Sequence, residues 1–120
     1  MIKIQFEGTF FATGFESLGD LIGDWIGRPT VKIRTLGEEL VYSDESVYLY
    51  CQSGISNPGP LETFLAEGSF TGELDEGRSW FDQLPELCAR HKIGCELVGS
   101  PLDERGEPAG EEIEIEVAAP

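Results

Sequence analysis

Three cysteines and a single histidine are the residues of this chain best suited to chemistry. Cys88 and His91 stand three positions apart, Cys95 follows four positions later, and Cys51 lies in the first half. Three thiolates and an imidazole could complete the tetrahedral shell of a structural zinc ion, and a thiol beside a histidine could act as a nucleophile. However, paired Cys-x-x-Cys spacing is missing, and Cys88 falls among leucines on an apolar stripe, which indicates burial. We therefore predict reduced thiols, no cofactor and no catalytic residues; a Cys₃His site is the alternative.

Acidic side chains far outnumber basic ones. The chain of 120 residues carries 23 aspartates and glutamates against 8 lysines and arginines, which gives a formal net charge of −15. The surplus is uneven, because residues 61–120 hold fifteen acids and residues 1–60 hold eight, with four bases in each half. A net charge of about 2–8 is enough to keep a small domain soluble. Binding to nucleic acid or to an anionic membrane through a basic surface is therefore excluded as the main activity.

The densest acidic stretch lies near the end of the chain, where Glu112, Glu114 and Glu116 alternate with apolar residues. In a strand these side chains share one face at intervals of about 7 Å and form a row of carboxylates. Because a row of like charges costs stability, we interpret it as a contact surface for a cationic partner. Aromatic anchors often supply the affinity of such interfaces. The predicted partner-binding residues are Glu104, Glu107, Glu111, Glu112, Glu114, Glu116, Asp75, Glu76, Tyr48 and Tyr50.

Two helices are expected to support these residues. Apolar residues recur at helical spacing over residues 15–26, with Thr13 as a cap and Gly27 as a stop signal. A second helix should begin at Ser79, and Pro85 must either kink it or lie in its first turn.

The remaining periodicity predicts strands and loops. Residues 61–65 fit either a strand or a helical turn, and residues 52–60 and 99–110 fit loops. Strands are expected at residues 1–7 (with an extension to 11), 31–34, 40–42, 47–51, 69–74, 95–98 and 113–117.

This order predicts a single α+β domain over residues 1–120, with an antiparallel sheet and two helices. Residues 1–54 and 61–117 repeat the order strand, helix, strand, strand, and Glu7-Gly8-Thr9-Phe10 is echoed by Glu67-Gly68-Ser69-Phe70. In topology such a duplicated unit resembles gyrase-inhibitor-like small-molecule binders. As an alternative function we consider a small-molecule-binding or small catalytic domain with a pocket between the halves near Trp25 and Trp80.

Charge and size together favour a binding protein over an enzyme. We expect a cytoplasmic inhibitor that neutralises a basic partner protein, either a nuclease toxin or a nucleic-acid-handling defence complex, by mimicking phosphate charge. In size and charge the chain resembles small acidic immunity proteins and phage-encoded inhibitors such as anti-CRISPR proteins. Direct contact with nucleic acid or with a membrane is not expected.

Overall fold

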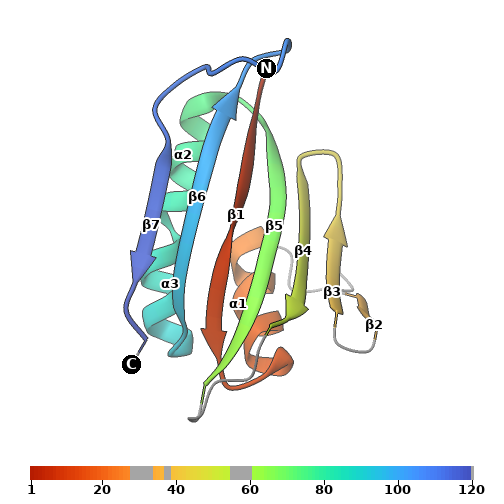
Figure 1. Ribbon diagram of the computed structural model, residues 1–120, viewed down its shortest axis with the longest axis vertical. Coiled ribbons are helices and arrows are strands. Elements are labelled where there is room, and N and C mark those ends of the chain that lie inside the picture. Colours follow the sequence, from red (N-terminus) through yellow and green to blue (C-terminus); the bar gives the residue numbers. More distant parts are fainter. Residues whose placement is uncertain (28–33, 37–38, 55–60, 120) are drawn as a thin grey trace.

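The computed structural model of the protein describes residues 1–27, 34–36, 39–54 and 61–119. These residues form seven strands and three helices (Figure 1). Along the chain the elements are β1 (Ile2–Ala12), α1 (Phe15–Ile26), β2 (Arg34–Leu36), β3 (Glu39–Ser43), β4 (Val47–Ser53), β5 (Glu62–Gly72), α2 (Leu74–Asp82), α3 (Leu84–His91), β6 (Gly94–Leu102) and β7 (Ile113–Val117).

The strands form one antiparallel sheet in the order β2-β3-β4-β5-β1-β6-β7. β1 pairs along its whole length with β5, from Ile2 opposite Gly72 to Ala12 opposite Glu62, and it pairs with β6 on its other side. The three helices lie on one side of this sheet, and no described helix covers its other side (Figure 1). The predicted α+β class with an antiparallel sheet and packed helices is confirmed.

α1 covers the sheet because it is amphipathic. Leu18, Leu21 and Trp25 are buried on one side of it. The prediction that Thr13 caps this helix is wrong, because the N-cap residue is Gly14 and no side chain makes a capping hydrogen bond. Gly27 ends the helix as expected, with a left-handed φ of 76°. Along the described part of the chain, no helix has both the length and the apolar character needed to cross a membrane.

Two stacked tryptophans hold α1 and α2 together above the centre of the sheet. The rings of Trp25 and Trp80 are nearly parallel, with centroids 3.8 Å apart. Each indole N–H donates a hydrogen bond to the main-chain carbonyl oxygen of the other tryptophan, at 2.8 and 2.9 Å. Phe6 of β1 packs against both indoles edge to face. Both polar atoms of this apolar cluster are therefore satisfied, as buried donors must be.

The second expected helix differs from the prediction in its start and its continuity. It begins at Leu74 rather than Ser79 and is interrupted at Gln83, which separates α2 from α3. Pro85 lies in the first turn of α3, where the missing N–H breaks no helical hydrogen bond. Of the two positions allowed for Pro85, the first turn is the observed one.

Several expected boundaries also move. Residues 61–65 are strand, and they join the strand expected at 69–74 to form the continuous β5, which ends at Gly72. The loop expected at 99–110 is shorter, because β6 continues to Leu102 and Leu102 forms a bridge with Pro108. Most of the strand expected at 31–34 and of the loop at 52–60 lies outside the described residues. The last strand, β7, has the predicted bounds.

The predicted repeat of elements holds only in part. In each half a long strand, β1 or β5, is followed by helix and then by shorter strands, but among the described residues the first half has three of these strands, β2 to β4, and the second half has two, β6 and β7. The last strand of the first half, β4, borders β5, whereas the first strand after the helices of the second half, β6, borders β1. The two halves therefore place their later strands in opposite order around the central β1–β5 pair.

Candidate functional site

We call the side of the sheet that the helices leave uncovered the open face. Its side chains come from alternate positions of the strands, because neighbours along a strand point to opposite sides. The strand register sets these side chains in rows that cross the sheet. From β3 to β7 one row is Val41, Tyr50, Glu67, Glu7, Val98 and Glu114. The adjacent row is Glu39, Gln52, Leu65, Thr9, Glu96 and Glu116.

Two pairs of glutamates face each other directly within these rows. Glu7 of β1 is opposite Glu67 of β5, and Glu96 of β6 is opposite Glu116 of β7. All four side chains are exposed. Opposite residues of an antiparallel pair have Cβ atoms about 4.5–5.5 Å apart, and like charges there destabilise the sheet. The free protein therefore bears a repulsion that a bound cation would relieve.

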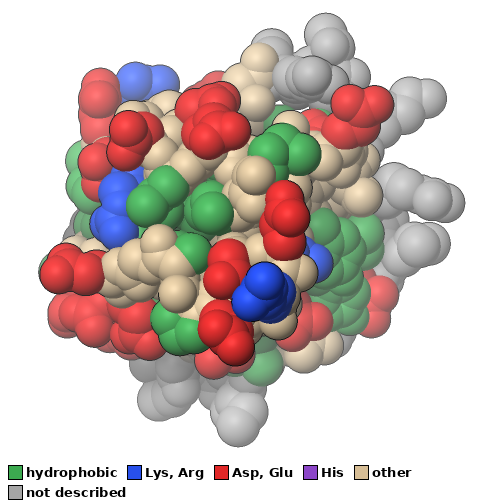
Figure 2. Space-filling view, turned by 90° about the horizontal axis from the view of Figure 1, so that it is seen from above, with side chains coloured by type: hydrophobic (Ala, Val, Ile, Leu, Met, Phe, Trp, Pro, Cys, Tyr) green, Lys and Arg blue, Asp and Glu red, His purple; other side chains and the backbone are tan. Residues whose placement is uncertain are grey.

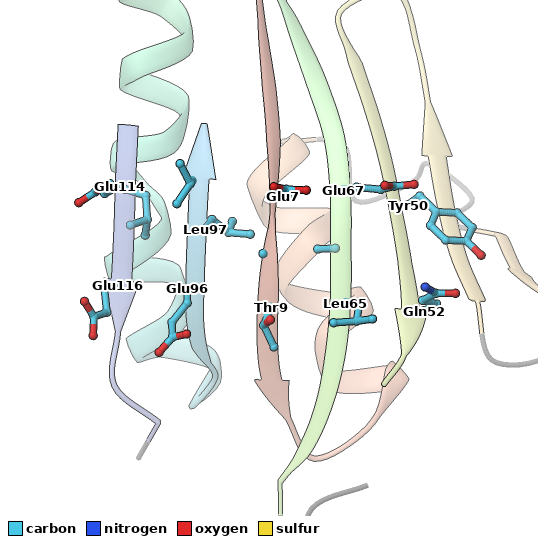
Figure 3. A pocket seen from close by; sticks show the side chains of 14 residues that line it. Glu7, Thr9, Tyr50, Gln52, Leu65, Glu67, Glu96, Leu97, Glu114 and Glu116 are labelled. Carbon is cyan, nitrogen blue, oxygen red and sulfur yellow. The ribbon is translucent and has the colours of Figure 1, made fainter. Parts of the chain in front are cut away.

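These glutamates border a hollow of about 770 Å³ on the open face (Figure 3). One side of it is formed by Tyr50 and Gln52 of β4, and the other by Glu114 and Glu116 of β7. A second hollow of about 500 Å³ lies beside it and shares Glu7, Glu67 and Val98 with it. The residues that line the second hollow but not the first are Lys3, Gln5, Phe6, Tyr48, Gly68, Ser69, Ser100 and Glu112.

The Glu-Gly dipeptides at residues 7–8 and 67–68 lie at the centre of this surface. Gly8 and Gly68 directly follow the opposed Glu7 and Glu67. A Cβ atom on Gly8 would lie 1.9 Å from the Glu96 carbonyl oxygen, and one on Gly68 would lie 2.1 Å from a carbonyl oxygen of β4. Only glycine permits such a close approach of neighbouring backbones. The repeated dipeptide thus combines close strand packing with a paired charge.

Acidity alone does not distinguish the open face. Figure 2 shows carboxylates around much of one end of the molecule, and the helices also carry exposed acids. On the helical side, however, bases partly compensate them: Arg90 lies 3.4 Å from Glu86 and 3.9 Å from Asp24, and His91 Nε2 lies 2.7 Å from Asp24 Oδ2.

The open face combines excess acid with a lack of base. Among its described side chains, Lys3 is the single base, and it stands at one end. The carboxylates there are Glu7, Glu39, Glu67, Glu96, Glu112, Glu114 and Glu116. Among the described side chains of this face, seven carboxylates therefore stand against one base.

The field of these carboxylates acts on Tyr50. The Glu39 carboxylate beside the hydroxyl group raises the pKa of Tyr50 to about 12, with smaller contributions from desolvation and from the charge of Glu67. All of these effects favour the neutral phenol, which keeps an O–H donor next to the glutamates.

Exposed apolar side chains lie among the acids of the open face. Tyr48 on β4, Leu65 on β5 and Val98 on β6 are 41 %, 44 % and 40 % exposed. Among the described residues, the other large hydrophobic side chain with such exposure is the terminal Met1. Apolar groups in a polar surround are typical of protein-binding surfaces.

The structure separates the predicted contact residues into three groups. Glu112, Glu114 and Glu116 lie on the open face with Tyr48 and Tyr50, at opposite borders of the two hollows.

The loop before β7 carries a second group, formed by Glu104, Glu107 and Glu111. All three side chains are exposed. Glu104 lies 3.7 Å from the N-terminal amino group, and Arg78 donates a hydrogen bond to the Glu111 carbonyl oxygen.

Asp75 and Glu76 form the third group, on the helical side. They border a depression in the first turn of α2, together with Phe70 and Trp80. The structure does not bring them together with the open-face residues.

Three central residues of the open face were absent from the predicted set: Glu7, Glu67 and Glu96. For two of them the sequence contained a signal. Glu7 falls on the polar side of the first expected strand, and Glu67 occupies the matching position of the similar four-residue segment at 67–70. The pairing of β1 with β5, which sets the two carboxylates opposite each other, could not be derived from the sequence.

The alternative Cys₃His site is not assembled. Cys88 Sγ and Cys95 Sγ lie 3.7 Å apart in the core, but His91 points to Asp24. All three cysteines are free and buried. Burial raises the pKa of Cys51 to about 12, and the thiol of Cys88, followed by burial, raises the pKa of Cys95. Within the described ranges, no group of three His, Cys, Asp or Glu side chains converges on a metal position.

Comparison of the chain with protein families, with curated proteins and with solved structures finds no match. The open face is therefore the feature of the molecule that bears on its function. The alternative function expected a pocket between the halves near Trp25 and Trp80. The two indole rings stack on each other, and a depression of about 500 Å³ borders Trp80 on the helical side. The larger hollow lies across the sheet from the indoles.

Proposed function

We propose that the protein binds a basic partner protein through the open face. The observation that carries this proposal is the presence of two directly opposed glutamate pairs, Glu7–Glu67 and Glu96–Glu116, on an uncovered surface. Solubility does not require such pairs, because isolated surface charges provide it without mutual repulsion. Lysine and arginine side chains of a partner would relieve the repulsion and fix the orientation of binding.

The partner class follows from the sign of the charge. Proteins with extensive basic surfaces commonly bind nucleic acid, whose phosphates the carboxylates would imitate. We propose an inhibitor that occupies the basic groove of a nuclease or of a nucleic-acid-handling defence complex. Electrostatic steering would give fast association that weakens as salt rises.

Two triple variants with the same net charge of −12 (−15 + 3) test this proposal. The first replaces Glu67, Glu114 and Glu116 of the open face by Gln. The second replaces three exposed helical carboxylates, with the substitutions Glu16→Gln, Asp20→Asn and Asp82→Asn. A peptide of lysine, glycine and serine of about 15 residues serves as the cationic probe, and its affinity is measured by calorimetry over a range of salt concentrations.

We expect the open-face variant to bind the peptide about five- to tenfold more weakly, since three exposed charge pairs contribute roughly 1–1.5 kcal/mol together. The helical variant should keep most of the affinity. Equal losses in the two variants would show that net charge alone attracts the peptide, and the proposal would then be wrong.

The larger hollow supports a second candidate, a small-molecule site for an organic cation. Its volume of about 770 Å³ is that of a typical ligand pocket, and Tyr50, Leu65 and Val98 add apolar surface to its carboxylates. Calorimetry with an aromatic quaternary ammonium compound tests this candidate. Binding that the Glu67→Gln substitution weakens would support it, and no binding at millimolar ligand would exclude it.

A further inference from the structure

The open face limits the kind of backbone that can dock on it. Within the sheet, the main-chain N–H and C=O groups of β5, β1 and β6 already pair with strands on both sides. An extended segment laid on this face would find no main-chain partners, and its own polar groups would lose water without compensation. An α-helix satisfies its backbone internally. The face therefore favours a helical segment of the partner.

The dimensions of the face suit a single helix. From β4 to β7 there are four strand spacings, or about 19 Å, and an α-helix with side chains is about 10–12 Å wide. Along β1 the two hollows extend from Lys3 to Thr9, or about 20 Å. A helix of that length has about 13 residues, or between three and four turns.

The side chains of the face define the sequence pattern of that helix. Tyr48 and Leu65 offer apolar contacts on the β4–β5 side, where Glu67 also stands, whereas Glu96, Glu114 and Glu116 offer three carboxylates on the β6–β7 side, around Val98. We propose, building on the function proposed above, that the partner docks a cationic amphipathic helix on the open face. Its lysines and arginines face β6 and β7, and its apolar residues face β4 and β5.

The charge distribution also orients this helix. The end of the face at Thr9, Glu96 and Glu116 is the more acidic, because at the opposite end the charge of Lys3 offsets that of Glu112, beside the uncharged Gln5. A helix has a partial positive charge at its N-terminus and a partial negative charge at its C-terminus. The N-terminus of the docked helix therefore lies at the Glu96–Glu116 end, and its C-terminus lies at Lys3.

Two peptides of about 13 residues with identical composition test the inference. Both consist of lysine, leucine, glutamine and alanine; in the first, lysines and leucines fall on two sides of a helix, and in the second the order is scrambled. We expect the first peptide to bind about tenfold more tightly and to gain helical circular dichroism on binding. The substitution Leu65→Thr, which keeps a good strand former, should weaken binding of the first peptide only.

The outcomes separate this inference from the proposed function. Equal affinity for both peptides, with both weakened by Glu67→Gln, would overturn the helical partner and leave the basic partner in place. Failure of both peptides to bind would overturn both.

A nitroxide label at either end of the helical peptide tests the orientation by NMR. An N-terminal label should broaden the amide signals of Thr9 and Glu116, and a C-terminal label should broaden that of Lys3. The reverse pattern would overturn the proposed orientation.

Discussion

Removing one glutamate from each opposed pair should stabilise the protein. The double substitution Glu67→Gln and Glu116→Gln leaves Glu7 and Glu96 without a like charge directly opposite. With Cβ atoms about 5 Å apart, the exposed carboxylates lie roughly 7 Å apart, and in water two such charges repel by about 0.6 kcal/mol. Two pairs therefore contribute about 1 kcal/mol, which corresponds to a rise in Tm of about 3–4 °C for a domain of this size.

Urea denaturation and thermal unfolding at low ionic strength measure this effect. Because the groups are exposed, the gain should shrink at about 0.5 M salt. The control is Glu86→Gln on α3, where Glu86 lies 3.4 Å from Arg90 in an i, i+4 pair. That substitution should lower the stability by about 0.3–0.5 kcal/mol. If the double variant were no more stable than the wild type, the opposed glutamates would not repel, and the main support for the proposed function would be lost.

Three further predictions concern packing and ionisation. Gly8→Ala should prevent stable folding, because its Cβ would overlap the backbone of the next strand. Gly23→Ala in α1, where a Cβ would meet no described atom within 4 Å, should instead raise the free energy of unfolding by about 0.5–1 kcal/mol. Urea denaturation measures both effects. Trp25→Phe should lower the free energy of unfolding by about 2–4 kcal/mol, because it leaves the buried Trp80 carbonyl group without its donor and removes buried apolar surface. It should also remove the near-UV circular dichroism of the stacked indoles. Tyr50 should ionise near pH 12 in an absorbance titration. The free energy of unfolding should therefore fall from about pH 10 to pH 12, because the unfolded state loses the phenolic proton first. Glu39→Gln should move the pKa of Tyr50 back toward 10, and an unchanged titration would contradict this prediction.

Local pattern was sufficient to predict most elements. The alternation of Ile113, Ile115 and Val117 defined β7, and the apolar stripe of residues 15–26 defined α1. Helix starts were less predictable, because α2 begins at Leu74 without a side-chain cap. The carboxylates of β7 could be assigned to one side of a strand from their spacing of two.

The centre of the candidate site depends on which strands are neighbours. Glu7 and Glu67 are sixty positions apart and belong to one site because β1 pairs with β5. Strand pairing depends on the whole core, and no local pattern in either strand specifies its partner. For the same reason, the sequence could not show that Asp75 and Glu76 fall on the helical side, away from the glutamates of β7.

The measurement that tests the central claim most directly is an amide-resolved NMR titration of the ¹⁵N-labelled protein with the lysine-glycine-serine peptide. If the open face binds cations, the shift changes should concentrate on the amides of β1, β5, β6 and β7 around Glu7, Glu67 and Glu114, and salt should reverse them. Shift changes distributed equally over the acidic positions of α1, α2 and α3 would contradict the claim.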